Sequence, residues 1–139
     1  MNVAQWMRHE VALASPGMDL GTALGLFRRH EVRVLPVVES GRLVGILTDI
    51  DLRDAPPSAA TVGVVMRAPA ALRPDQSIEE AALLLLGRQA LALPVVEAGR
   101  PVGILTETEL LQAFLQLRGK GPLDIAAAAL ECGGEASPR

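Results

Sequence analysis

The chain has 139 residues, half of them hydrophobic, and a formal net charge of −3 at pH 7. This length suits one compact domain, or two very small ones that share a core, and the composition excludes a disordered chain. The weak negative charge excludes a basic field for nucleic acid or anionic lipid, and no apolar run reaches the ~20 residues that span a bilayer. Cys132 has no internal disulfide partner and the N-terminus lacks a signal-peptide layout, so we expect a cytoplasmic protein.

An internal repeat organises the chain. Residues 35–39 (Leu-Pro-Val-Val-Glu) recur at 93–97, and residues 44–48 (Val-Gly-Ile-Leu-Thr) recur at 102–106, both with an offset of 58. Two copies of about 55 residues are each too small to bury a comfortable core. We therefore expect one body in which each copy needs the other.

The repeat also sets the expected domain boundaries. The dipeptide Met-Arg at 7–8 returns at 66–67, one residue out of step with the rest. We assign residues 1–57 to the first copy and 58–118 to the second, with a proline-rich connection between them. Residues 119–139 form a C-terminal extension, for which we expect partial disorder.

An amphipathic helix comes early in each copy. Apolar residues between 20 and 27 are spaced i, i+3, i+4, i+7 and predict a helix that begins near Asp19. The same stripe occupies residues 78–85 of the second copy. Ser77 and Glu80 form a capping box at the start of this helix, which satisfies its first free amides.

A hairpin follows each of these helices. Residues 32–38 and 90–96 predict buried strands, each with a proline that suggests an edge position or a strand start. Residues 43–47 and 101–105 predict their partners across glycine-centred turns.

A second helix follows each hairpin. In the first copy a proline pair at 56–57 stops it early, whereas in the second copy it continues towards Arg118, and Gly119 ends it. We also expect a short helix over residues 123–130. The predicted fold class is α/β (α+β).

Thr48 and Asp51 form the leading candidate site. The motif Thr48-x-x-Asp51 lies where a strand ends and a helix begins, so that free amides and the positive helix end face outward. The Thr48 hydroxyl would bond a phosphate oxygen, and the Asp51 carboxylate would accept hydrogen bonds from ribose hydroxyls. The same pattern is also a capping box that needs no ligand. The residues alone leave both interpretations open.

The order of these motifs resembles the cystathionine-β-synthase (CBS) domain. An apolar helix, Leu-Pro-Val-Val, Gly-Arg, Val-Gly-Ile-Leu-Thr and an acid three residues on occur twice within residues 3–118. The resemblance implies two β-α-β-β-α repeats packed as a pseudo-two-fold pair, a Bateman module. It also implies a regulatory role, with adenine nucleotides bound in two equivalent clefts between the repeats.

The resemblance further implies the residues of each site. The nucleotide-binding set in the first copy is Thr48, Asp51, Leu13, Ala14, Val32, Arg33 and Val34. A second, weaker set is Thr106, Glu109 and Ala71. Glu109 is the longer acid and suits capping better than ribose binding, so we expect the first-copy site to be the competent one. Core packing explains Leu13, Val32 and Val34 equally well, and a solvated charge explains Arg33.

Other chemistries find little support in the sequence. The two histidines, His9 and His30, have no Cys/His spacing that suits zinc, so we expect neither a metal site nor an enzyme. Three aromatic residues make no stacking platform for nucleic acid. We expect no required cofactor, and a ligand such as AMP, ADP, ATP or S-adenosylmethionine.

A ligand-free dimerisation or protein-interaction scaffold is the rival interpretation. The leucines at 83–86 cover more than one face of their helix, which predicts a second buried surface. A homodimer would supply that surface, and we expect one. The protein target of such a module is not identifiable from the sequence.

Overall fold

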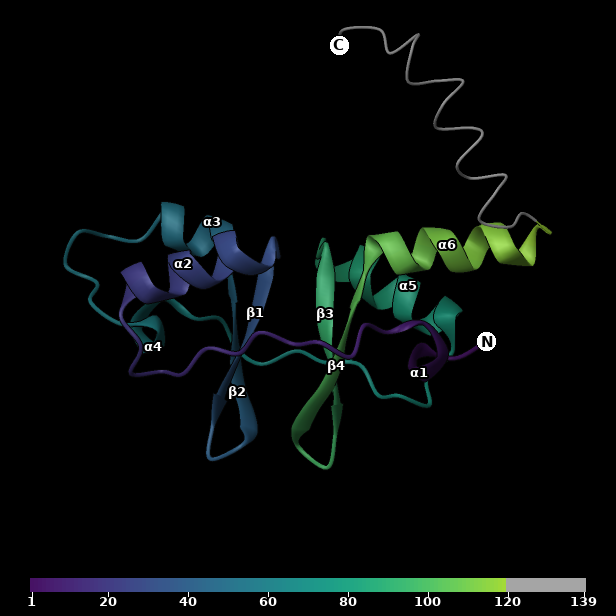
Figure 1. Cartoon of the computed structure of the whole chain (residues 1–139), viewed down its shortest axis with the longest axis horizontal. Helices are drawn as coiled ribbons and strands as arrows, with labels where there is room; N and C mark the ends of the chain where they lie inside the picture. The colour runs from purple at the N-terminus through teal and green to yellow at the C-terminus, as the bar shows by residue number, and fades with distance from the viewer. Residues whose placement is uncertain (120–139) are drawn as a thin grey trace, which may run out of the picture.

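The computed structural model describes residues 1–119, so the helix expected over 123–130 and the end of the C-terminal extension lie outside the described residues. The chain forms two lobes side by side, each built on a two-stranded antiparallel sheet, and the two hairpins meet at the centre (Figure 1). The predicted α+β fold of two repeats is confirmed.

The first repeat contains the hairpin β1–β2. Its elements in chain order are α1 (Val3–Trp6), α2 (Leu20–His30), β1 (Val34–Glu39), β2 (Arg42–Thr48) and α3 (Asp49–Arg53). Asp19 caps α2 as predicted, because its Oδ1 accepts the Thr22 amide at 2.6 Å. The helix α3 is short, as predicted from the proline pair that follows it.

The second repeat has the same order with a longer last helix. Its elements are α4 (Val62–Val65), α5 (Ile78–Arg88), β3 (Ala92–Glu97), β4 (Arg100–Thr106) and α6 (Glu107–Leu117). The predicted capping box at the start of α5 is confirmed, since Ser77 Oγ accepts the Glu80 amide at 3.0 Å. The helices α1 and α4 were not expected, because four residues are too few to show a helical period.

The first strand of each hairpin begins two residues later than the sequence predicts. The helix α2 ends at His30 and is capped by Glu31, whose φ of 52° is left-handed, and the Val32 amide still donates to Phe27 O at 3.3 Å. Residues 32–33 therefore complete the helix end instead of entering β1. A β-α-β-β-α repeat also has a strand before its first helix. In the structure this strand is a single parallel bridge, which in the first copy joins Ala14 to Val37.

The proline in the middle of β1 is accommodated by its orientation. Pro36 pairs with Ile46 of β2, and its carbonyl accepts the Ala14 amide at 2.9 Å. A residue's N and C=O point to the same side of a strand, so the Pro36 nitrogen faces the short bridge and not β2. The missing N–H of proline therefore costs no hydrogen bond between β1 and β2.

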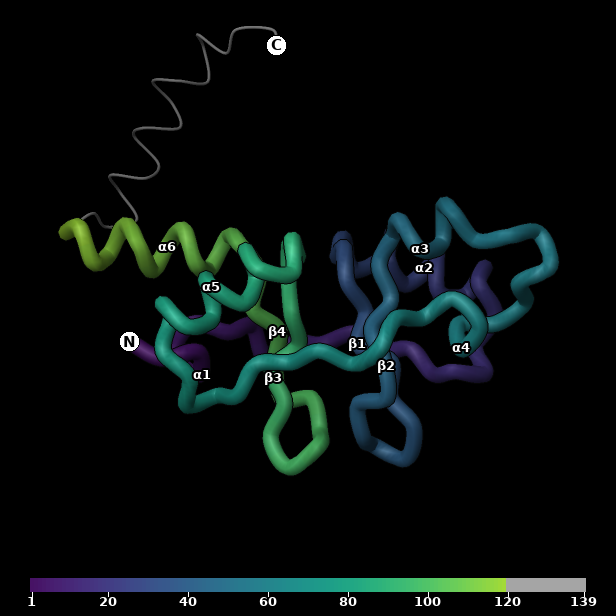
Figure 2. The backbone as a smooth tube through the Cα atoms, turned by 180° about the vertical axis from the view of Figure 1, so that it is seen from behind, coloured from purple at the N-terminus to yellow at the C-terminus, as the bar shows by residue number. Residues whose placement is uncertain are grey.

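The two repeats exchange their first segments. Val3 of α1 is fully buried in the core of the second copy, and its amide donates to Gln76 O at 2.8 Å. Val62 of α4 is likewise buried in the core of the first copy, and its amide donates to Met18 O at 2.9 Å. Figures 1 and 2 show both connecting segments running from one lobe to the other. Each repeat therefore completes the core of the other.

Glycines in β2 and β4 allow the exchanged segments to pass. A Cβ on Gly45 would lie 2.7 Å from Met66 Sδ and 2.8 Å from the carbonyl oxygen of Arg67. A Cβ on Gly103 would meet the equivalent Met-Arg pair of the first copy at 2.6 and 2.8 Å. Only glycine fits this approach, which explains the glycine in both Val-Gly-Ile-Leu-Thr motifs.

A small apolar seam joins the two hairpins. Val34, Ala92 and Ile104 are buried against each other, and Ile46 packs on them. This seam lies between the larger cores of the two lobes. It holds the start of β1 beside the start of β3, which brings the candidate site together.

Candidate functional site

A cavity of about 520 Å³ lies between the two repeats. The first repeat supplies the segment after α1 (residues 8–12) and the junction of α2 with β1 (residues 30–34). The second repeat supplies the junction of β4 with α6 (residues 106–108), together with Leu91 and Ala92. Neither repeat forms this cavity alone.

The helix α6 starts at the cavity. Thr106 caps this helix, and Thr106, Glu107 and Thr108 all line the cavity, so its first turn presents two hydroxyls and a carboxylate there. The first amides of an α-helix lack intrahelical partners and carry the positive end of the helix dipole. The first amide of α6, that of Glu107, is bonded to Leu91 O at 3.0 Å, so the helix dipole and the remaining first-turn amides make this end of the cavity suitable for an anion.

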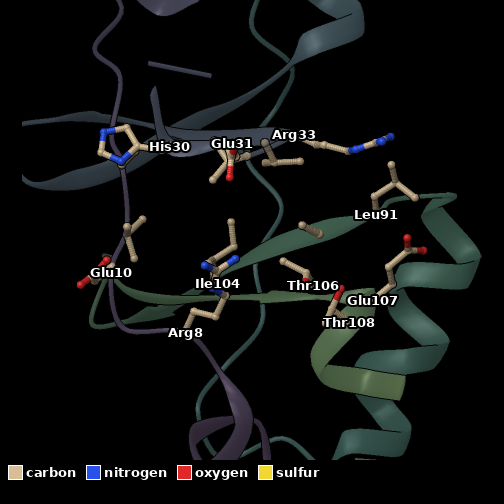
Figure 3. A pocket seen from close by; sticks show the side chains of 15 residues that line it. Arg8, Glu10, His30, Glu31, Arg33, Leu91, Ile104, Thr106, Glu107 and Thr108 are labelled. Atoms are coloured by element: carbon tan, nitrogen blue, oxygen red, sulfur yellow. The ribbon is translucent and has the colours of Figure 1, made fainter. Parts of the chain in front are cut away.

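The exchange of first segments brings Arg8 into the site. The Arg8 amide donates to Ile104 O at 2.8 Å, and the Ile104 amide donates back to Arg8 O at 2.9 Å. Figure 3 shows the Arg8 side chain beside Ile104 in the middle of the cavity. Arg8 belongs to the first repeat in sequence, but it serves the β4 strand of the second.

The cavity carries charges of both signs. Its acidic side chains are Glu10, Glu31 and Glu107, and its basic ones are Arg8, Arg33 and His30. Figure 3 shows a group at each end, one with Glu10 and His30 and the other with Glu107, Thr108 and Leu91. Within residues 1–119 no ion pair joins these groups. They are free to bind a charged ligand.

Glu109 is held away from the cavity by its own helix. Its Oε1 accepts the Thr106 amide at 2.9 Å and the Thr106 hydroxyl at 2.6 Å. The side chain is buried, with 8% of the residue exposed, and it does not line the cavity. In this structure Glu109 acts as the acid of a capping box.

The equivalent motif of the first repeat has a different arrangement. Asp51 Oδ2 accepts the Thr48 amide at 2.9 Å, and Thr48 Oγ1 accepts the Asp51 amide at 3.2 Å, which completes a capping box. Asp51 Oδ1 accepts a further bond from Arg67 Nε at 2.8 Å. Arg67 is the repeat equivalent of Arg8, so one of the two arginines is paired with the local acid and the other is not.

The structure separates the residues that the sequence grouped in the first-copy site. Val32, Arg33 and Val34 line the cavity together with Thr106, whereas Thr48 and Asp51 do not. The physical reason is that the cavity is built between the copies, so the strand start of one faces the helix start of the other.

The remaining predicted residues lie outside the lining of this cavity. Leu13 is exposed and Ala14 is buried in the first-copy core. Ala71 is exposed in the corresponding segment of the second copy.

Sequence reasoning missed several of the lining side chains. These are Arg8, Glu10, His30, Glu31, Glu107 and Thr108. The repeated Met-Arg dipeptide was the available signal for Arg8. No motif in the sequence marks His30 at the end of α2, or the three acids, as residues of a binding site.

Two further properties describe residues 1–119. In this part of the chain no group of three or more His, Cys, Asp or Glu side chains is placed to hold a metal ion. The same residues contain no helix with the length and apolar character required to cross a membrane.

Known proteins share this architecture. The crystal structure of CBSX2 in complex with AMP has a TM-score of 0.77 and 30% identity, covering 84% of this chain and 98% of that one. Another CBSX2 structure, a CBS-pair protein from Arabidopsis thaliana, has a TM-score of 0.74 and 28% identity, covering 86% and 98%. The CBS domain pair of protein MJ0100, at 24% identity and a TM-score of 0.76, shares the fold over 82% of this chain and 95% of that one.

Sequence comparison agrees with the structural likeness. The CBS domain-containing protein YhcV of Bacillus subtilis (strain 168) is 31% identical over 115 residues, which cover 78% of this chain and 82% of that protein. The family model of the CBS domain matches twice, at residues 3–58 and 62–116. The chain belongs to the CBS domain family and carries two copies of the domain, as its repeated motifs predict.

Proposed function

We propose that the chain is a regulatory, non-catalytic module that binds an adenosyl ligand, such as AMP, ADP, ATP or S-adenosylmethionine, in the cavity between its repeats. The cavity carries this proposal, because its volume of about 520 Å³ lies within the roughly 300–1,000 Å³ of small-molecule sites. The AMP complex of the 30% identical CBSX2 supports the ligand class.

The phosphate of the ligand would lie at the start of α6. The Thr108 hydroxyl and the remaining amides of the first turn of α6 are suited to phosphate oxygens, and Arg8 and Arg33 supply positive charge from the opposite repeat. Bonds of this kind between ionised groups are about twice as strong as neutral ones. Together they would fix the charged end of the ligand.

The adenosine part would lie against the apolar wall of the cavity. Val11, Ala12, Val34 and Ile104 line that wall, and the first two stand in a segment whose backbone is available to read the base edge. The carboxylates of the cavity would accept hydrogen bonds from the ribose hydroxyls.

The motif of Thr48 and Asp51 remains our candidate for a second site. Asp51 would bind the ribose and Thr48 the phosphate, with Leu13 and Ala14 in the segment near the base. We now rank this site below the cavity at Thr106, because Arg67 already occupies Asp51 Oδ1. A ligand would have to displace that contact first.

Thermal unfolding against AMP, ADP, ATP and S-adenosylmethionine tests the proposal, since a ligand that binds the native state raises Tm. Arg8→Ala should weaken binding about ten- to a hundredfold, the loss expected for a hydrogen bond to a charged group. Arg67→Ala is the matched control, because it removes the equivalent arginine of the other repeat. It should leave the affinity of the cavity unchanged.

The outcomes separate three interpretations. Loss of binding in Arg8→Ala alone supports the cavity at Thr106. An effect of Arg67→Ala or Asp51→Ala without one of Arg8→Ala would move the ligand to the first-copy motif. If none of the four compounds raises Tm at millimolar concentration, the adenosyl proposal is wrong.

The second candidate function is a ligand-free dimerisation or interaction scaffold. One observation favours it, namely that α5 and α6 expose several large apolar side chains, including Leu83, Leu86, Leu111 and Phe114. A scaffold would keep its oligomeric state and its protein target without any nucleotide. We retain the homodimer as a prediction under either function.

A further inference from the structure

One end of the cavity carries side chains of opposite charge. Val34 and Ala92 pack on each other in the apolar seam, and the residues before them, Arg33 and Leu91, line the cavity. The Glu107 amide donates to Leu91 O at 3.0 Å, which holds the start of α6 at the same place. Figure 3 shows Arg33 and Glu107 on either side of Leu91. A guanidinium of the first repeat and a carboxylate of the second therefore share this end.

The fold does not use either of these charges. Arg33 and Glu107 are both exposed, and within residues 1–119 their side chains form no ion pair and no hydrogen bond. The first-repeat equivalent of Glu107 is Asp49, at the offset of 58, and its Oδ1 accepts the Ile50 amide at 3.0 Å. The equivalent of Arg33 is Leu91. The same repeat therefore forms with no free acid at the first position and no basic residue at the second.

A phosphate group would use only part of this end. Its oxygens would gain Arg33 and the remaining amides of the first turn of α6, but they would lie beside the Glu107 carboxylate, and like charges repel. An α-amino carboxylate carries both signs on groups attached to the same carbon atom. Its carboxylate suits Arg33 and its ammonium group suits Glu107. Leu91, which is 40% exposed between them, offers contact to an aliphatic chain.

We propose that the cavity selects an adenosyl ligand with an α-amino carboxylate at its 5′ end, whose carboxylate binds Arg33 and whose ammonium group binds Glu107. This inference rests on the proposed function, because it names the ligand class of the same cavity. It makes Arg33 and Glu107 specificity-determining residues. S-adenosylmethionine fits this description, whereas AMP, ADP and ATP carry phosphate at the 5′ end.

Four adenosine compounds separate the groups that the cavity could recognise. S-adenosylmethionine and S-adenosylhomocysteine both carry the amino-acid end, but only the first has a positive sulfur. 5′-Methylthioadenosine has neither charge, and AMP has a phosphate. In titration calorimetry of the full chain, the first two should have similar Kd values, each about tenfold below that of 5′-methylthioadenosine. Equal affinities of S-adenosylhomocysteine and 5′-methylthioadenosine would overturn the proposal, and so would a preference confined to the positive sulfur.

Substitution of Glu107 should change two affinities in opposite directions. Glu107→Gln should weaken S-adenosylhomocysteine about tenfold, because it removes the charged partner of the ammonium group. It should strengthen AMP about threefold, because it removes a like charge beside the phosphate. A purely structural effect would weaken both ligands and would overturn the proposal. Asp49→Asn is the matched control in the first repeat and should change neither affinity.

Substitution of Arg33 tests the carboxylate contact. Arg33→Leu, which copies the residue of the other repeat, should weaken S-adenosylhomocysteine and AMP about tenfold each and leave 5′-methylthioadenosine unchanged. Equal weakening of 5′-methylthioadenosine would show that Arg33 only shapes the cavity, and would overturn its role. Circular dichroism checks that each variant is folded.

The proposed function fails by a different result. If AMP or 5′-methylthioadenosine binds and the amino-acid end adds no affinity, only this inference is wrong. If no adenosine compound binds, ADP and ATP included, the proposed function is wrong and the inference is wrong with it.

Discussion

Arg67 Nε lies 2.8 Å from Asp51 Oδ1, so a residue of the second repeat is bonded to the acid that begins the last helix of the first. The other oxygen of Asp51 accepts the Thr48 amide at 2.9 Å. One carboxylate thus caps a helix and ties the two repeats together. The equivalent Glu109 caps its helix and makes no such contact, because both of its side-chain hydrogen bonds are with Thr106.

This contact predicts that substitutions of Asp51 and Arg67 lower the free energy of unfolding by unequal amounts. Asp51→Ala should lower the free energy of unfolding by about 1–2 kcal/mol, because it removes a cap and an exposed ion pair. Arg67→Ala should cost less than about 1 kcal/mol, since its side chain is 57% exposed. Urea denaturation measures both. In the double variant the costs should fall short of their sum, and strict additivity would show that the ion pair contributes nothing.

The close approach at Gly103 predicts a large effect of one methyl group. Gly103→Ala should destabilise the fold by about 1–3 kcal/mol, since its Cβ would lie 2.8 Å from the carbonyl oxygen of Arg8. Gly25→Ala is the control, because no atom lies within 4 Å of the added Cβ in the middle of α2. That variant should gain up to about 1 kcal/mol from helix propensity. Equal effects of the two substitutions would contradict the crossing geometry.

The two capping boxes of the second repeat differ in burial, and this difference is measurable. Glu109→Ala should cost about 1–2 kcal/mol, because it leaves the part-buried Thr106 amide and hydroxyl without their acceptor. Glu80→Ala removes the same kind of contact at an exposed helix start, and we expect about 0.5 kcal/mol. Thermal unfolding ranks the two variants. The opposite ranking would indicate that the hydrogen bonds of Glu109 to Thr106 do not stabilise the fold.

Asp19 predicts an acid-dependent part of the stability. The amide of Thr22 donates to Asp19, and this bond holds the pKa of the carboxyl below its ordinary value. Its stabilising effect is therefore complete above about pH 4, the ordinary range of aspartate, and is lost as the pH falls through the lowered value. Asp19→Asn keeps a good cap that does not titrate.

The free energy of unfolding of the native chain and of Asp19→Asn, compared from pH 6 to pH 2.5, isolates the contribution of Asp19 ionisation. The stability difference between native chain and Asp19→Asn should be constant above about pH 5 and should change below about pH 4. A difference that stays constant over the whole range would show that Asp19 does not titrate differently in the folded state.

The sequence predicts what depends on near neighbours. The caps at Asp19 and Ser77 and the hairpins are set by residues within a few positions of each other, and all are present. The short helix α1 had a local signal as well, because Asn2 and Gln5 form a reciprocal capping box that the apolar period did not reveal.

The composition of the cavity could not be predicted in the same way. Arg8 and Thr106 are far apart in the chain and meet only because α1 crosses to the other lobe. A resemblance that assigns Thr48 and Arg33 to one copy says nothing about which copy each of them faces. The Met-Arg dipeptide repeats with an offset that differs by one residue from the offset of the strands. Because of this difference, the sequence does not predict which strand residues the crossing segments contact.

The crossing of α1 also affects how the protein is made on the ribosome. Val3 leaves the exit tunnel long before Leu105, yet both belong to the same core cluster of the folded chain. The segment around Val3 therefore lacks these apolar partners until β4 has emerged from the ribosome. When β4 is still inside the ribosome, the segment around Val3 should be open to proteases, and emergence of β4 should protect it.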